Sequence, residues 1–82
     1  MNKKLIYQYV KKIKKEDILE FSKRQDINLR DDELDLIYDY IKNKTDIILD
    51  NPEEILEKIK DKLSKKVYLK ILELYIKYED YF

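Results

Sequence analysis

The side chains best placed to do chemistry are three aspartates in the middle of the chain. Asp32, Asp35 and Asp39 follow one another at i, i+3 and i+7, so on a helix they line one face. Carboxylate oxygens are the ligands that Mg²⁺ takes in proteins. The same acids line a predicted helix from its N-terminal end, where negative charge is stabilised without any ion. We favour this second interpretation, a solvated acidic face, and expect no metal site.

The rest of the composition removes most catalytic chemistry. The 82 residues include no histidine, no cysteine and no glycine. Histidine and cysteine supply the commonest general bases, nucleophiles and metal ligands, and glycine-rich loops cradle phosphates. Without cysteine there are also no disulfides. We therefore expect no catalytic residues, no cofactor and no enzymatic activity.

Tyrosine is the unusual residue type in this sequence. Four of the eight tyrosines lie in the last stretch of the chain. A tyrosine ring buries apolar area while its hydroxyl stays in water, which enriches tyrosine in binding surfaces. Core packing is the simpler explanation for most of these tyrosines. The more specific explanation is a surface for self-association or for a protein partner. The residues that we assign to such a partner-binding surface, as a hypothesis, are Tyr68, Tyr75, Tyr78, Tyr81 and Phe82.

A charge gradient underlies the zero net charge. Residues 1–15 carry six lysines and no acid, residues 16–57 carry 14 acids against 5 bases, and residues 58–82 carry 7 bases against 4 acids. The gradient lets the segments attract one another as they pack. The N-terminal lysines, interleaved with Ile6, Tyr7 and Tyr9, also have the composition to lie on nucleic acid or an anionic membrane. Little arginine and no dense basic stripe argue against both partners.

The absence of glycine and the single proline favour helices, because strands joined by tight turns usually need glycine at positive φ. Apolar residues recur at helical spacing along most of the chain. We therefore predict an all-α fold of five to six short helices in a single domain over residues 1–82. The expected helices cover residues 3–12, 15–25, 31–44, 45–50, 52–63 and 65–80.

Two of these helices are expected to begin after a basic residue. Lys14 and Arg30 each precede a run of acids, which would meet the positive end of the helix dipole. Neither basic side chain can accept a hydrogen bond, so each is a poor N-cap, and we expect Arg30→Thr to stabilise the protein. Apolar pairs stand at the N′ and N4 positions of a hydrophobic staple: Ile13 with Ile18, and Leu29 with Leu34.

The remaining helix starts carry better caps. Asn51 is a favoured N-cap, Pro52 is preset for the first helical position, and Glu54 has the spacing of a capping box. Thr45 is expected to cap the short helix over residues 45–50, and Ser64 the last helix. Three apolar residues of the short helix are expected to point inward: Ile47, Ile48 and Leu49.

The stretch from Lys65 to Phe82 organises the predicted fold. Its charges fall on one narrow helical stripe, formed by Lys66, Lys70, Glu73, Lys77 and Asp80. Nearly every residue off this stripe is apolar or aromatic. Such a helix must be covered on two or three sides by other helices or by a second copy of the chain. We expect the short helices to pack around it and the last two helices to form an antiparallel αα-hairpin.

Several local motifs together resemble a known family. They are Lys-Ile-x-x-Glu-Asp-Ile-Leu over residues 12–19, Ile-Asn-Leu-x-x-x-Glu-Leu over residues 27–34, a short isoleucine-rich turn and a serine-capped final helix. This order is similar to the YqfT-like family of small uncharacterised helical proteins from low-GC Gram-positive bacteria. The resemblance implies a cytoplasmic all-helical protein and transfers no site residues.

These observations favour a binding role over a catalytic one. No run approaches the roughly 18 apolar residues of a membrane span, and Gln8, Lys11 and Lys12 interrupt any signal-like apolar segment. We expect a small cytoplasmic protein-interaction module that binds a protein partner or associates with itself. The alternative is a regulator that associates with nucleic acid, or that mimics nucleic acid through the acidic middle of the chain.

Overall fold

The structure is a computed structural model that describes residues 3–78 and, at Tyr78, the backbone alone. These residues form six helices and no strand, so the predicted all-α fold is confirmed. The helices are α1 (Lys3–Lys12), α2 (Lys15–Arg24), α3 (Asp31–Asn43), α4 (Thr45–Asp50), α5 (Pro52–Ile59) and α6 (Lys65–Tyr78). The predictions made for residues 79–82, among them the end of the last helix, lie outside the described residues.

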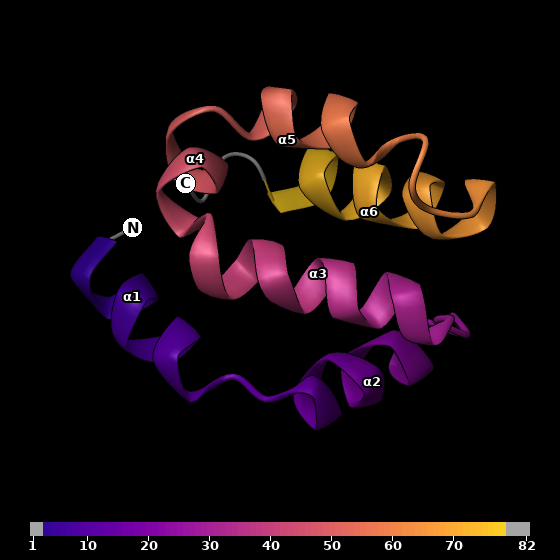
Figure 1. Cartoon of the computed structure of the whole chain (residues 1–82), viewed down its shortest axis with the longest axis horizontal. Coiled ribbons are helices and arrows are strands. Elements are labelled where there is room, and N and C mark those ends of the chain that lie inside the picture. The colour runs from indigo at the N-terminus through magenta and orange to yellow at the C-terminus, as the bar shows by residue number, and fades with distance from the viewer. Residues whose placement is uncertain (1–2, 79–82) are drawn as a thin grey trace.

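Helix α3 lies in the middle of the molecule (Figure 1). It packs most closely against α2 and α4 and also contacts α1, while α4 packs against α5. The composition of the last helix predicts this central position for α6, but the structure gives it to α3. The physical reason is that α3 also carries apolar and aromatic side chains on more than one side, so several neighbours can cover it.

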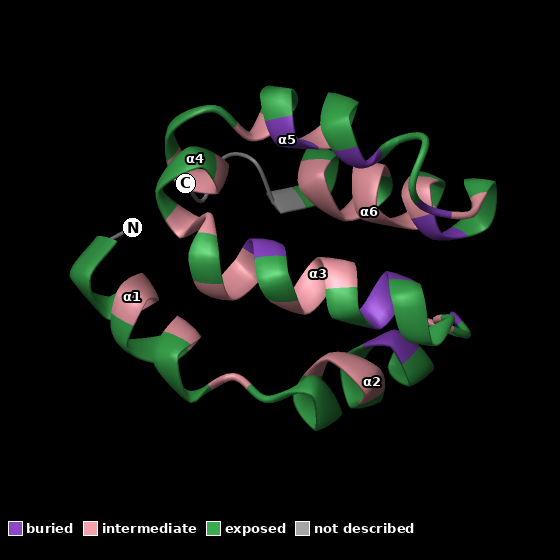
Figure 2. Ribbon diagram, in the orientation of Figure 1, coloured by how far each residue is buried: buried purple, intermediate pink, exposed green. Residues whose placement is uncertain are grey.

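One apolar core joins α3, α5 and α6 with the link that follows α2. Its buried side chains are Ile27, Tyr40, Ile55, Ile59, Leu63 and Val67. Figure 2 shows these buried segments in purple on α3, α5 and α6. Ile55 and Ile59 stand one helical turn apart, so a single face of α5 enters the core. The shared core ties α5 to α6, whereas their close packing as a regular hairpin stays a prediction.

Helix α5 is shorter than predicted. It ends at Ile59 instead of Leu63, and residues 60–62 form a turn in which the N–H of Lys62 bonds the carbonyl of Ile59 at 3.0 Å. The apolar periodicity does continue to Leu63, which is buried. The turn places Leu63 in the core and the backbone of Ser64 beside Glu33, so tertiary contacts override the local pattern.

One prediction about α4 is wrong, and a second is wrong for one of its three residues. Lys44 is the N-cap of α4, and Thr45 is its first residue. The Thr45 hydroxyl donates to the carbonyl of Ile41 at 2.6 Å, one turn back in α3, so the side chain closes α3 and does not cap α4. Of the three side chains expected to point inward, Ile47 is exposed, whereas Ile48 and Leu49 are half-buried and Ile48 packs against the core.

Helix α2 ends in a Schellman motif built on an aspartate. Asp26 has a φ of 58°, the left-handed conformation that glycine usually supplies at this position. The N–H of Asp26 bonds the carbonyl of Lys23 at 3.0 Å, and the N–H of Ile27 bonds the carbonyl of Ser22 at 2.9 Å. Ile27, the next residue, is buried in the core. In a chain without glycine, these bonds and this burial hold Asp26 in a conformation that costs roughly 1–2 kcal/mol.

The basic N-caps predicted at Lys14 and Arg30 are confirmed, and neither side chain makes a capping hydrogen bond. The third residue of each helix instead reaches back to the N-cap backbone. Asp17 accepts from the N–H of Lys14 at 2.8 Å, and Glu33 accepts from the N–H of Arg30 at 3.0 Å. This is the half of a capping box that a basic N-cap permits, because lysine and arginine side chains carry no acceptor.

No side chain of α1 is fully buried, and hydrogen bonds link this helix to α3 and α4. The Nζ atom of Lys42 in α3 donates to the carbonyls of Val10 and Lys11, each at 2.8 Å, at the C-terminal end of α1. A cation at this end also meets the negative end of the helix dipole. Two side chains of α1 bond aspartates of α4: Lys3 with Asp50 at 2.9 Å, and Tyr7 with Asp46.

Candidate partner-binding surface

Helix α6 is less covered than its composition predicts. Among its described side chains, Val67 alone is fully buried, at 2 % exposure, while six of the others are half-buried and six are exposed. Leu69 and Ile76 are 50 % and 61 % exposed. The exposed residues of α6 share one arc, about a third of the helix circumference. This arc, which we call the outer face of α6, consists of Lys65, Lys66, Leu69, Glu73, Ile76 and Lys77.

The outer face differs from the predicted charged stripe in one important respect. Lys66, Glu73 and Lys77 belong to both, but the exposed arc is rotated so that it also takes in Leu69 and Ile76. These two leucine and isoleucine side chains stand seven residues apart, two helical turns along the same side. Exposed apolar side chains that line up in this way are typical of an interaction surface.

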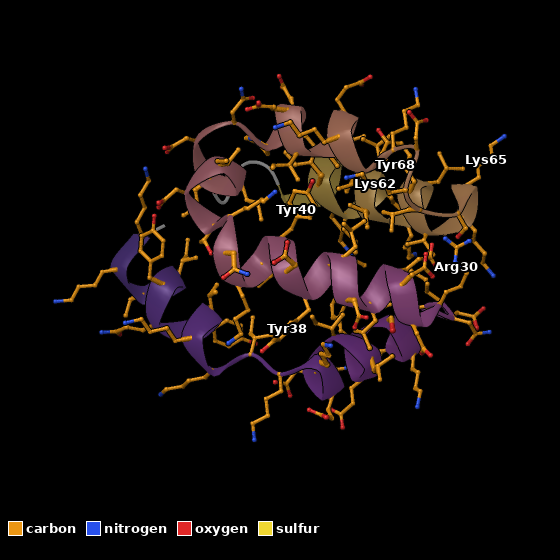
Figure 3. All side chains as sticks on the ribbon, in the orientation of Figure 1. Arg30, Tyr38, Tyr40, Lys62, Lys65 and Tyr68 are labelled. Atoms are coloured by element: carbon orange, nitrogen blue, oxygen red, sulfur yellow. The ribbon has the colours of Figure 1, made fainter. Side chains whose placement is uncertain are left out.

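The tyrosines assigned to the partner surface have different surroundings. Tyr68 of α6 is half-buried and packs against the core. Figure 3 labels this side chain on the side of α6 that lies toward α5. Tyr75 is half-buried and lines an apolar cavity. Tyr78 is described by its backbone alone, and Tyr81 and Phe82 lie outside the described residues. Tyr68 and Tyr75 thus lie at the border between the core and the outer face.

Two partly open apolar cavities, each of about 390 Å³, are lined by side chains of both α3 and α6. Phe21 of α2 helps to line the first, and Tyr75 and residues of α4 and α5 line the second. Four side chains line both cavities: Ile37, Ile41, Ile71 and Leu74.

A buried glutamate anchors the N-terminal end of α6. Glu33 of α3 is 1 % exposed. One carboxylate oxygen accepts from the N–H of Arg30, and the other accepts from the N–H of Ser64 at 2.7 Å. The Ser64 hydroxyl in turn accepts from the N–H of Val67 at 3.4 Å, so the serine caps α6 as predicted. One carboxylate therefore serves the first turns of both α3 and α6, where the positive ends of both helix dipoles meet.

The pKa of Glu33 is set by two opposing effects. Burial raises the pKa of the carboxyl, whereas hydrogen bonds from the backbone of Arg30, and from the backbone and hydroxyl of Ser64, lower it. The Arg30 guanidinium, 3.7 Å from the carboxylate, lowers it further. The balance lies below the ordinary value, so Glu33 is ionised at neutral pH. A charged carboxylate is the stronger acceptor for two helix N-termini.

The three aspartates considered for a metal site each bond a separate group. Asp32 pairs with the Arg30 guanidinium at 3.0 and 3.2 Å, and this pair lowers the pKa of Asp32. Asp35 pairs with Lys15 of α2 at 2.7 Å, and Asp39 accepts from the side chain of Asn43 at 2.6 Å. From residue 3 to residue 78 the side chains form no acidic cluster with the arrangement of a metal site.

Two tyrosines of α3 take part in contacts that the sequence did not reveal. Tyr38 and Tyr40 point from α3 to opposite sides, as expected for residues two apart on a helix (Figure 3). Lys15 and Lys42 lie 5.5 and 5.6 Å from the centre of the Tyr38 ring, and Lys44 lies 4.5 Å from that of Tyr40. These cation–π contacts use lysines of three segments to hold the middle of the molecule together.

Comparison with known proteins identifies no family for this chain. No family model, no curated protein and no solved structure matches the chain. The resemblance to the YqfT-like family therefore stays a prediction. Among the described helices, none combines the length and the apolar character needed to cross a membrane.

Proposed function

We propose that this protein is a small protein-interaction module that associates with itself through the outer face of α6. The observation that carries the proposal is the exposure of Leu69 and Ile76. The largely apolar composition of α6 predicts that neighbouring helices or a second copy of the chain cover these side chains. Leu69 and Ile76 are already partly covered, so completing the burial of each would contribute roughly 1 kcal/mol.

The alternatives named from the sequence have weaker support. Lys3 and Lys15 pair with Asp50 and Asp35, and Lys42 bonds α1, so part of the basic charge is used within the chain. The same pairs neutralise part of the acidic surface that a nucleic-acid mimic would need.

Sedimentation equilibrium over a wide range of protein concentration tests the proposal. We expect the average mass to rise toward twice that of the chain as the concentration increases. Leu69→Asp should remove this rise, because it places a charge in the apolar contact. Leu5→Asp is the matched control, since Leu5 of α1 is 61 % exposed on another helix and its substitution should leave association unchanged. Mass that never rises, together with salt-dependent retention on heparin, would favour the nucleic-acid alternative.

A further inference from the structure

The outer face of α6, together with Leu72 at its edge, has the pattern of a helix-pairing seam. Leu69, Leu72 and Ile76 follow one another at the a, d and a positions of a heptad, and Lys65 occupies the preceding d position. Leu72 is half-buried beside the exposed Leu69 and Ile76, so the three form a continuous apolar line. We infer that this line pairs with the same line of a second copy, with the two α6 helices antiparallel around a two-fold axis.

Charge decides the direction of the pairing. In a parallel pair, each d position faces its own copy, so Lys65 would lie against Lys65 of the other chain, which is unfavourable. In an antiparallel pair, a positions pack against d positions. Leu69 then packs on Leu72 of the other chain, and Ile76 packs on the aliphatic stem of Lys65, whose ammonium group can reach water.

The flanking residues are complementary in the same antiparallel register. Lys66 and Glu73 occupy the e positions, which face one another across an antiparallel seam. Lys66 of each chain therefore lies opposite Glu73 of the other, and the two-fold axis repeats the pair. Glu73 pairs at 3.4 Å with Lys70 of its own helix, but this glutamate is two-thirds exposed, and such surface pairs are weak enough to exchange.

The other flank of the seam contains two of the tyrosines that the sequence analysis assigned to a partner-binding surface. Tyr68 and Tyr75 occupy the g positions, where each lies opposite the other across the two-fold axis. Their half-buried rings border both the core and the seam, so a second copy would complete their cover. Self-pairing through one helix buries less than the roughly 1,200–2,000 Å² of stable complexes, so we expect a dimer that dissociates in the micromolar range.

This pairing rests on the proposed function, and charge reversal tests its register. Lys66→Glu and Glu73→Lys should each raise the dissociation constant about tenfold, because each turns two attractive pairs into two repulsive ones. The double variant should restore the wild-type constant. A mixture of the two single variants should form heterodimers preferentially, since every facing pair is then attractive. Measurement by sedimentation at about 50 mM salt keeps screening low.

Controls separate the register from the wider proposal. Glu57→Lys makes the same change of charge on the exposed side of α5, and it should leave the dissociation constant unchanged. Circular dichroism checks that each variant stays folded. If the wild-type protein dimerises but the double variant and the mixture show no recovery, the antiparallel seam is wrong and self-association stands. If the wild-type protein stays monomeric at millimolar concentration, the seam and the proposed self-association both fall.

Discussion

One carboxylate oxygen of Glu33 accepts a hydrogen bond from the backbone N–H of Ser64 at 2.7 Å, although the two residues lie 31 positions apart. Figure 1 shows the consequence, since α3 and α6 begin at the same end of the molecule. The other oxygen caps α3 through Arg30. Glu33 therefore fixes where α6 starts relative to α3.

Glu33→Gln should destabilise the protein by about 2 kcal/mol. The amide keeps one acceptor oxygen but presents an NH₂ group to a backbone N–H, so one buried hydrogen bond to a charged group is lost. Urea unfolding measures the effect. Asp17→Asn is the matched control, because Asp17 is the equivalent capping residue of α2 and is exposed. Its cost should stay below about 1 kcal/mol. Equal costs for the two variants would contradict a special role for Glu33.

The free energy of unfolding should fall in acid because the carboxylate of Glu33 becomes protonated. Its pKa in the folded state lies below the ordinary 4.5, so the stabilisation is complete above about pH 4.5 and is lost as the pH falls through the folded-state pKa. We expect the urea midpoint to be steady between about pH 7 and pH 5 and to drop below that range. Glu33→Gln should show a smaller drop. Parallel pH profiles for the two proteins would assign the acid sensitivity to other carboxylates.

Asp26→Gly should stabilise the protein by about 1 kcal/mol, because glycine adopts positive φ without the strain that aspartate bears there. The loss of chain entropy that glycine incurs on folding offsets part of this gain. Thermal unfolding is the measurement. Glu20→Gly, at an exposed interior position of α2, should instead cost about 1 kcal/mol. A lower melting temperature for Asp26→Gly would show that the aspartate side chain contributes more than its backbone strain costs.

Lys42→Met should loosen α1 without unfolding the rest of the chain. The substitution keeps the apolar stem but removes the two hydrogen bonds to Val10 and Lys11, and α1 has no buried side chain to replace them. We expect faster amide hydrogen exchange across residues 3–12 and little change in α5. Lys23→Met, on the exposed side of α2, serves as the control. Exchange that accelerates equally everywhere would mean that α1 is part of the cooperative core.

The Arg30→Thr substitution shows how tertiary structure changes a local expectation. From the sequence, threonine is the better N-cap and should stabilise α3. In the structure, the Arg30 guanidinium also pairs with Asp32 and lies 3.7 Å from the buried Glu33. Threonine would remove a positive charge beside a buried carboxylate, so the gain from the cap is offset. Lys14→Thr is the cleaner test of the same cap, because Asp17 there is exposed.

The sequence by itself determined the helices, because the signals that start and position them are local. Apolar spacing, the absence of glycine, the acidic first turns and the Asn51-Pro52 start depend on residues within a few positions of each other. Tertiary structure alone decided the end of α5, the central place of α3 and the burial of Glu33, because these depend on contacts between residues far apart in the chain. Tertiary structure also decided which residues of α6 are exposed. Composition predicts a thin charged stripe, and only the packing of the helices leaves Leu69 and Ile76 exposed beside it.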